Sequence, residues 1–339
     1  MVRRKQCRTT DVYIIEERER QTLSPYAALS AETRGREYPI DPCPVRTAFV
    51  RDRDRIIHCK SFRRLKHKTQ VFLSPIGDHY RTRLTHTLEV AQIARTIARG
   101  LLLNEDLTEA IAMGHDLGHT PFGHSGESVL NRIVPGGFEH NKQSLRIVEK
   151  LENGKGLNLT FEVRDGILNH KKSGHPSTLE GVVVSLADRI AYVNHDIDDA
   201  VRAGLLSNDI LPKSCIEAIG ATHGERINTL VLDILQTSSG KNHVEMSGEI
   251  SSEFEKLRQF LFDNLYHDSA AKAEEGKAEG VIERLYYHYL KHVSELPPEF
   301  TKYIDEDGPD RIAADYIACM TDRYAVRDYT RLFVPADWA

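Results

Sequence analysis

The chain has 339 residues, of which 40% are hydrophobic and 28% charged, and its formal net charge is −5 at pH 7. This composition is typical of a globular protein, and the charge excludes a chain that is basic throughout and binds nucleic acid by charge alone. No apolar run is long enough for a membrane helix or a signal peptide, so we expect a cytoplasmic protein without a membrane contact. The five cysteines show no CxxC spacing, which argues against a disulfide framework or a zinc–thiolate site.

Helical periodicity dominates the chain, so the sequence predicts an all-α fold. Residues 1–45 are expected to form a turn-rich N-terminal arm with one short helix near 11–21. Residues 46–205 are expected to form the catalytic core, and residues 206–339 a C-terminal helical region packed on it. Leu84–Leu103 gives the clearest helical pattern, and further helices are expected at 105–117, 125–133, 141–152, 160–169, 178–203, 212–222, 224–236, 252–267, 278–294 and 309–327.

Clusters of turn-forming residues predict the connections between these helices. Residues 153–156 and 171–176 are expected to be loops, and residues 238–247 a loop or a short ribbon. Residues 269–280, rich in Ala, Lys, Glu and Gly, are expected to form a solvated connector. Almost no alternating apolar and polar run predicts a strand.

Four His and Asp side chains carry the strongest chemical signal: His86, the doublet His115-Asp116, and Asp188. Each alone is more typical of a core histidine, a helix cap or an ion pair. Asp188 follows a long apolar run, where burying a lone carboxylate is costly unless a metal ion or Arg189 offsets its charge. Together they indicate a divalent metal site, which can generate hydroxide and polarise a phosphoryl oxygen. The sequence therefore predicts metal-assisted hydrolysis of a phosphate ester.

Further titratable residues follow the doublet. His124 begins a new helix, and Glu127 lies three residues later on the same face. A glutamate there can orient the imidazole and raise its pKa, as a general acid or base near neutrality requires. The alternative is an ordinary capped helix start. His119 is spaced to face the same pocket, and His140 adds another imidazole.

Cations are dense from Arg51 to Lys68, with eight Lys or Arg against two Asp. They alternate with apolar positions, which favours a half-buried helix that aims cations into a cleft for a triphosphate, rather than a solvated face. Arg83 faces the same side as His86 and is the best single candidate for a phosphate ligand. The other arginines, including Arg63 and Arg189, divide evenly between ligands and structural partners. The basic run is also predicted to contact single-stranded DNA weakly.

Asp188, Tyr192 and Asp196 recur every four residues and therefore share one helix face. A carboxylate, an aromatic ring and a second carboxylate would then line one cavity. Ordinary core packing is the alternative for Tyr192, and two neighbouring aspartates compete with Asp196 for the inward position. Asp322 is expected to close the cavity from the C-terminal helix.

The order of these residues resembles the HD superfamily of metal-dependent phosphohydrolases, and within it the dGTPase-like deoxynucleotide triphosphohydrolases. The resemblance covers about residues 23 to 328 and is most specific between 46 and 200. It lies in Arg46–Phe49, Arg51–His58, Phe62–Leu65, Lys68–Phe72, Arg81–Val90, His115–Glu127, Ala187–Tyr192 and Asp315–Asp322. Cys319 departs from the glycine usual in the family, which leaves the packing of the last helices open.

The resemblance implies an all-α HD-domain fold with additional C-terminal helices. It implies cleavage of a dNTP between the 5′ oxygen and the α-phosphorus, giving a deoxynucleoside and inorganic triphosphate. His86, His115, Asp116 and Asp188 would hold the metal; His124 with Glu127 would form a catalytic pair, and His119 and His140 would lie near the scissile phosphate. Arg83 would bind phosphate and Gln70 a sugar hydroxyl. Tyr192 would pack on the deoxyribose and exclude a 2′-OH.

Several points stay open at this stage. The metal is Mg, Mn, Fe or Co, and the base preference is not visible, although dGTP is one candidate. The family resemblance adds homo-oligomers and activation by a second dNTP as expectations. An HD-type nucleotide phosphatase or cyclic-dinucleotide phosphodiesterase is the alternative enzyme, and a nucleotide sensor or nucleic-acid scaffold is the non-catalytic alternative.

Overall fold

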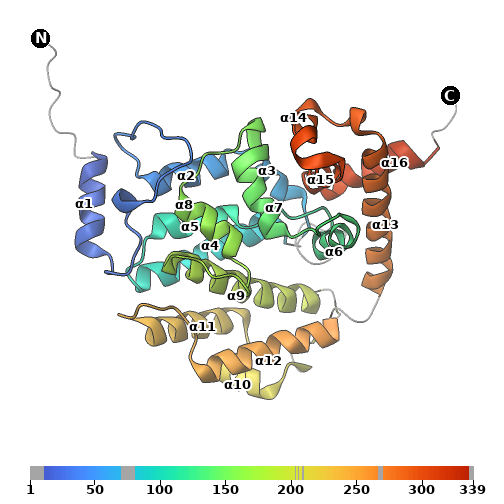
Figure 1. Cartoon of the computed structure of the whole chain (residues 1–339). Coiled ribbons are helices and arrows are strands. Elements are labelled where there is room, and N and C mark those ends of the chain that lie inside the picture. Colours follow the sequence, from blue (N-terminus) through green and yellow to red (C-terminus); the bar gives the residue numbers. More distant parts are fainter. Residues whose placement is uncertain are drawn as a thin grey trace, which may run out of the picture.

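The computed structural model describes residues 11–69, 81–202, 204, 206–207, 210–265 and 270–335. These residues form helices and short helical turns joined by loops (Figure 1), with two isolated bridges, between Arg36 and Thr160 and between Thr69 and Thr82. The all-α prediction is confirmed. No helix in the described ranges combines the length and the apolar character that crossing a bilayer requires.

The N-terminal part begins with a short helix, as predicted. Its helices are α1 Val12–Thr22, α2 Ala48–Ile57, α3 Lys60–Arg64, α4 Arg83–Gly100, α5 Glu105–Gly114, α6 Gly123–Ile133, α7 His140–Arg146, α8 Phe161–Asn169 and α9 Leu179–Arg202. A π-helical turn over Ile147–Leu151 continues α7. The C-terminal helices are α10 Lys213–Ile219, α11 His223–Ser238, α12 Gly248–Leu265, α13 Ala270–Lys291, α14 Pro298–Thr301, α15 Ile304–Ala318 and α16 Asp322–Phe333.

Two sequence predictions in the C-terminal region were wrong. Of the expected connector 269–280, residues 270–280 belong to α13, because Ala, Lys and Glu are strong helix formers even where they bury little apolar surface. The single helix expected over 309–327 is two helices. Thr321 starts the second, since its side chain accepts a hydrogen bond from the backbone N–H of Tyr324 and caps a new helix.

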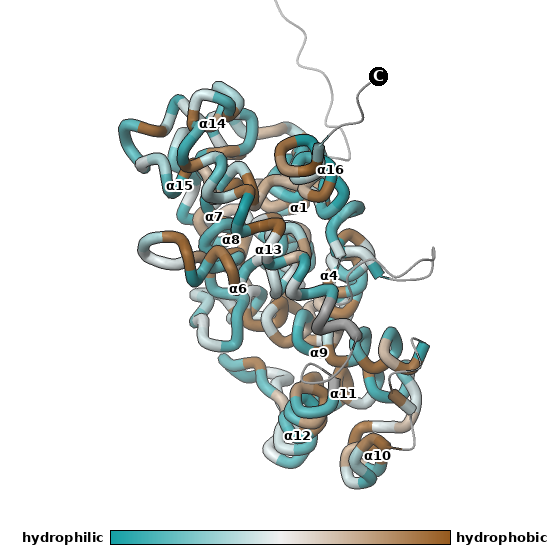
Figure 2. Tube along the Cα trace, turned by 90° about the vertical axis from the view of Figure 1, so that its right-hand side faces the viewer, coloured by the Kyte–Doolittle hydropathy of each residue, from teal (hydrophilic) through white to brown (hydrophobic). Residues whose placement is uncertain are grey.

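Two hydrophobic clusters hold the helices together. The larger one joins α2, α4, α5, α8 and α9 and continues into α10, α11 and α12. The smaller one joins α6 to α13, α15 and α16. In Figure 1, α9 runs between the α4–α5–α8 layer and the α10–α12 group. Apolar and polar stretches alternate along the tube in Figure 2, as expected of helices that bury one face each.

The start of α4 is fixed by a reciprocal cap. The Thr82 hydroxyl accepts from the N–H of Thr85 at 3.3 Å, and the Thr85 hydroxyl accepts from the N–H of Thr82 at 3.0 Å. This cap sets the rotation of the first turn, from which Arg83 and His86 point inward. A second close approach requires Gly118, because a Cβ there would collide with the backbone of α7. The loop after α5 therefore lies directly against the start of α7.

Candidate active site

A cavity of about 580 Å³ opens between α4, α9, α12, α13 and the loops that follow α5 and α8. Its lining includes five histidines, four acidic side chains, five cations and one tyrosine. These residues are His86, His119, His124, His140, His170; Asp116, Asp188, Glu275, Glu279; Arg83, Lys171, Lys172, Arg189, Arg258; and Tyr192. Residues more than a hundred positions apart thus meet in one pocket of nucleotide size.

His86, His115 and Asp188 form a tight cluster at one wall of this cavity. His86 Nε2 lies 3.1 Å from Asp188 Oδ1, and His115 Nε2 lies 3.7 Å from the same oxygen. One ligand atom from each of the three lies within 4.8 Å of the others. Asp116 is adjacent, with Oδ1 at 3.4 Å from His115 Nε2. The four residues predicted as metal ligands are therefore neighbours, contributed by α4, the end of α5 and α9.

The cluster fits a cation. His115 Nδ1 donates to the carbonyl oxygen of Ala112 at 2.7 Å, so its Nε2 carries the lone pair, and this buried nitrogen has no hydrogen-bond partner. Although burial alone lowers the pKa of His115, Asp116 and Asp188 raise it to about 9. The carboxylates of Asp116 and Asp188 thus stabilise a positive charge at the position that His115 Nε2 faces. A proton or a divalent metal ion can supply that charge.

Arg83 is buried beside the cluster. Its Nη1 donates to Asp116 Oδ2 at 2.9 Å, and the other oxygen of Asp116 lies 3.2 Å from His119 Nε2. Burial raises the pKa of the Asp116 carboxyl, but His115, His119 and Arg83 lower it well below its usual range. Arg83 therefore stabilises the carboxylate while its side chain also lines the cavity, where a phosphate would lie.

The expected pairing of Glu127 with His124 is not the one found. Glu127 accepts from the ring Nδ1 and from the backbone N–H of His140, both at 2.9 Å. His124 and Glu127 do share a face of α6, but the first residue of α7 presents two donors to the same carboxylate. The His119 ring stacks on His140 with 4.0 Å between centroids. His140, held by Glu127, thus supports the ring of His119, whereas His124 faces the open cavity.

The cavity histidines differ in their preference for a proton. Burial and the nearby Arg83 lower the pKa of His119 well below its usual range, and the same two causes lower the pKa of His124. Burial raises the pKa of Glu127, but the hydrogen bond from His140 outweighs it and lowers that pKa strongly. His124 is therefore a neutral imidazole near pH 7, able to take a proton from a water molecule in the cavity.

Comparison with known proteins agrees with this geometry. Residues 83–193 match the family model of the HD domain, and residues 244–331 match a phosphohydrolase-associated domain. A deoxyguanosinetriphosphate triphosphohydrolase-like protein of Caldanaerobacter subterraneus is 60% identical over 96% of both chains. A protein of the same name from Clostridium perfringens is 52% identical, and the match covers 95% of this chain and 97% of that protein. Another from Geobacter sulfurreducens is 42% identical, and the match covers 94% of this chain and 96% of that protein.

The chain belongs to the deoxyguanosinetriphosphate triphosphohydrolase-like family. A phosphohydrolase structure from Bacteroides thetaiotaomicron shares the fold, with a TM-score of 0.52 and 17% identity over 82% of this chain and 68% of that one. HD domains are metal-dependent phosphohydrolases, and the matched HD segment contains all four residues of the His–Asp cluster.

Two of the expected substrate contacts of this dGTPase-like protein, Arg63 and Asp196, do not line the cavity. Gln70 is outside the described residues. Arg63 is exposed and donates to the carbonyl oxygen of His58 at 2.8 Å, so it does not reach the cavity. Tyr192 and Arg189 do line the cavity, but Asp196, one turn further along α9, is buried and does not. Burial raises the pKa of Tyr192 to about 12, so its hydroxyl stays protonated.

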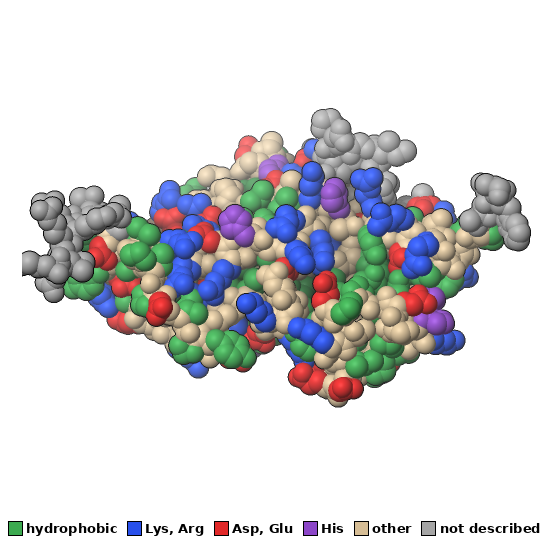
Figure 3. All heavy atoms as spheres, turned by 90° about the horizontal axis from the view of Figure 1, so that it is seen from above, with side chains coloured by type: hydrophobic (Ala, Val, Ile, Leu, Met, Phe, Trp, Pro, Cys, Tyr) green, Lys and Arg blue, Asp and Glu red, His purple; other side chains and the backbone are tan. Residues whose placement is uncertain are grey.

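The basic run in this family member is mainly structural. Arg53 pairs with Glu109 at 2.9 Å, and Arg55 donates to the carbonyl oxygen of Asn158 at 2.7 Å. Neither these arginines nor the other described cations of Arg51–Lys68 line the cavity. Figure 3 shows Lys and Arg side chains spread over the face seen from above, with acidic side chains among them.

Sequence reasoning missed six charged or histidine residues of the site: His170, Lys171, Lys172, Arg258, Glu275 and Glu279. His170 lies at the end of α8, with its Nε2 3.2 Å from His140 Nε2. The two lysines follow in a segment predicted only as a loop, and Arg258 lies in a helix without any motif. The two glutamates lie in the segment predicted as a solvated connector. The doublet Lys171-Lys172 directly after a buried histidine was the one available signal.

Proposed function

We propose that this protein is a metal-dependent triphosphohydrolase that converts dNTPs to deoxynucleosides and inorganic triphosphate. The observation that carries this proposal is the buried Nε2 of His115, which has no hydrogen-bond partner and faces the Asp116 and Asp188 carboxylates beside the cavity. The cavity is lined by five cations and two further carboxylates, Glu275 and Glu279, so a cation at the cluster and a polyanion among the five cations would balance these charges. The names of the relatives agree with this substrate class.

In this proposal His86, His115, Asp116 and Asp188 hold the divalent metal, which is Mg, Mn, Fe or Co. When bound, the ion supplies Lewis-acid stabilisation of the charge that develops on the α-phosphate. Arg83 holds the α-phosphate from the other side, and Lys171, Lys172, Arg189 and Arg258 hold the triphosphate tail.

His124 accepts a proton from the attacking water or returns one to the leaving 5′ oxygen. Its lowered pKa favours the first role near neutral pH. Glu127 keeps His140 oriented, and His140 supports the stacked ring of His119 against the phosphate. Tyr192 packs on the deoxyribose, where a 2′-OH would clash with the ring.

The test is to incubate the protein with each dNTP and each rNTP in Mn²⁺ or Mg²⁺ and to resolve the products. Deoxynucleoside with inorganic triphosphate is the expected result, lost in His115→Ala and retained in the exposed control His243→Ala. Orthophosphate or pyrophosphate would instead indicate an HD-type phosphatase or phosphodiesterase. Absence of turnover with mixed dNTPs would indicate a sensor.

Homo-oligomerisation and activation by a second dNTP remain proposals that rest on the family resemblance, and a weak contact with single-stranded DNA remains a proposal that rests on the basic run Arg51–Lys68. Light scattering tests the first, and kinetics with paired dNTPs the second. Binding of a fluorescent oligonucleotide at increasing salt tests the third, since phosphate contacts weaken steeply with salt.

A further inference from the structure

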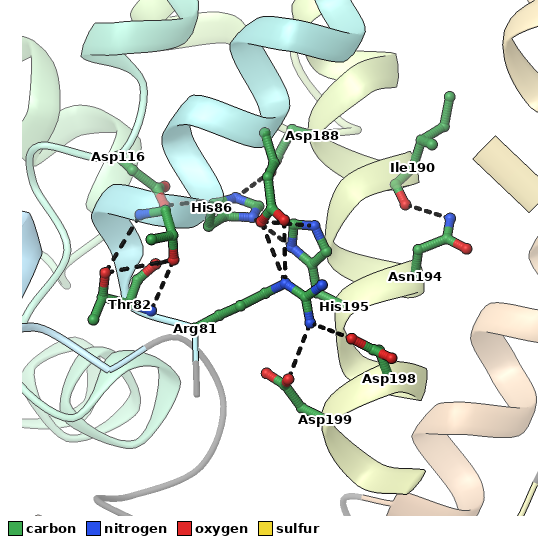
Figure 4. A network of polar contacts seen from close by, with 12 residues as sticks. Arg81, Thr82, His86, Asp116, Asp188, Ile190, Asn194, His195, Asp198 and Asp199 are labelled. Carbon is green, nitrogen blue, oxygen red and sulfur yellow. Dashed lines mark hydrogen bonds and ion pairs between the residues drawn. The ribbon is translucent and has the colours of Figure 1, made fainter. Parts of the chain in front are cut away.

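A line of polar contacts leads from His86 away from the cavity. On the side opposite Asp188, His86 Nδ1 lies 3.3 Å from Nδ1 of His195, and both rings are fully or almost fully buried. Figure 4 shows the two imidazoles side by side, one from α4 and one from α9. The rings meet edge to face, with 5.4 Å between centroids. Beyond them, His195 Nε2 lies 3.0 Å from Glu89 Oε2.

The protons along this line can be placed from their partners. His86 must keep the lone pair on Nε2 if that nitrogen is to bind a metal ion, so its Nδ1 carries the hydrogen. The only acceptor beside that N–H among the described residues is Nδ1 of His195. A neutral His195 then carries its own hydrogen on Nε2, toward Glu89. The carboxylate lies off the N–H direction, so this last contact is chiefly a charge–dipole attraction.

Glu89 is itself held in place. The Arg81 guanidinium lies 3.3 Å from Glu89 and also pairs with Asp198 at 2.8 Å and Asp199 at 3.0 Å. Figure 4 shows Arg81 pointing toward these two aspartates of α9. On its other side, His195 is covered by the parallel ring of His223 at 6.2 Å between centroids. His195 therefore has a fixed position in which only one of its nitrogens faces the metal cluster.

We propose that His195 is a positioning residue for the metal centre: it accepts the Nδ1 hydrogen of His86 and so fixes the tautomer and orientation in which His86 Nε2 binds the ion. This inference rests on the proposed function, because it takes His86 as a metal ligand. Metal-ligating histidines usually donate their second N–H to a carbonyl or carboxylate; here a second imidazole, backed by Glu89, takes that position.

The test measures Mn²⁺ affinity directly, from the electron paramagnetic resonance signal of free Mn²⁺ in titrations of the full-length protein. His195→Ala removes the acceptor and is expected to weaken Mn²⁺ binding by about 10–100-fold. His195→Asn keeps an acceptor near the position of Nδ1 and is expected to restore most of the affinity. If His195 had only a structural role, His195→Ala and His195→Asn proteins of equal thermal stability would bind Mn²⁺ with equal affinity.

Two further variants keep the test decisive. His195→Leu fills the ring's space without an acceptor and is expected to bind Mn²⁺ as weakly as the alanine variant, should alanine prevent folding. His243→Ala removes an exposed histidine that does not line the cavity and is expected to leave the affinity unchanged. Wild-type affinity in folded His195→Ala and His195→Leu would overturn the inference while leaving the proposed function intact. Failure of the wild-type protein to bind any of Mn²⁺, Mg²⁺, Fe²⁺ and Co²⁺ would overturn both.

Discussion

Glu180 offers the clearest link between a buried charge and stability. It lies in the first turn of α9, fully buried, and its Oε1 accepts from the backbone N–H groups of Ala28 and Asn104, both at 2.9 Å. It thereby joins the N-terminal arm to the start of α5. Its Oε2 is buried without a hydrogen-bond partner, and burial raises the pKa of this carboxyl from 4.5 to about 7.

The size of the effect follows from that pKa. The folded protein favours the neutral carboxyl, so this group's contribution to the free energy of unfolding is greatest below pH 4.5 and falls as the pH rises toward 7. A difference of about 2.5 pH units corresponds to about 3 kcal/mol, which is the full cost of the buried carboxylate above pH 7. Glu180→Gln keeps the acceptor Oε1 but cannot ionise. We therefore expect it to stabilise the protein by about 2–3 kcal/mol at pH 8 and to change little at pH 4.5.

Urea unfolding at these two pH values measures the difference, with the exposed Glu249→Gln as the matched control. The control is expected to change the free energy of unfolding by less than about 0.5 kcal/mol at either pH. If Glu180→Gln destabilised the protein equally at pH 4.5 and pH 8, the charged form would not be the penalised one, and the reasoning would be refuted.

Three further predictions concern the site. Glu127→Gln should lower kcat about 10–100-fold in steady-state assays, because His140 loses charge-assisted hydrogen bonds; an unchanged kcat would place this pair outside the reaction. Tyr192→Ala should raise hydrolysis of rNTPs relative to dNTPs in competition assays, since the ring no longer meets the 2′-OH; an unchanged ratio would put sugar selection elsewhere. Dialysis against a chelator should abolish turnover and lower the Tm, and added Mn²⁺ should restore both; turnover that survives chelation contradicts the metal-dependent mechanism.

Apolar periodicity was sufficient to predict most of the fold. Long helices such as α4 and α9 bury one face, so their sequences repeat at helical spacing and their approximate bounds are visible. The helix over residues 270–280 was not predicted because this first half of α13 is rich in Ala, Lys, Glu and Gly, a composition that a helix and a solvated linker share. The break near Thr321 escaped it because apolar spacing continues across the cap.

The His–Asp cluster could be predicted from the sequence because its members belong to strong local motifs. The pairing of Glu127 with His140 could not be predicted, because it depends on how α7 approaches α6, which no local spacing encodes. The cations of the cavity were missed for a similar reason. The run of arginines around Arg53 was predicted to bind phosphate, yet Arg53, Arg55 and Arg63 pair with a carboxylate or a carbonyl oxygen close by. Arg258 instead reaches the cavity from a helix that is distant in the sequence.

Helices α15 and α16 act on the site through backbone contacts, whereas α12 and α13 line the cavity with side chains such as Arg258. Asp322, at the start of α16, does not close the cavity; its carboxylate accepts from the backbone N–H of Phe122 at 3.0 Å and of Thr69 at 2.9 Å. Buried Lys68 donates to the carbonyl oxygens of His119 and of Ala318, at the end of α15. The loop that carries His119 is thus tied at two points to the α15–α16 junction. The backbone hydrogen bonds within that loop join only near neighbours, such as the N–H of His119 and the carbonyl oxygen of Asp116 at 3.3 Å, so these ties help to fix where His119 meets Asp116 and His140. The region matched by the phosphohydrolase-associated model therefore shapes the HD site without contributing a side chain to it from α15 or α16.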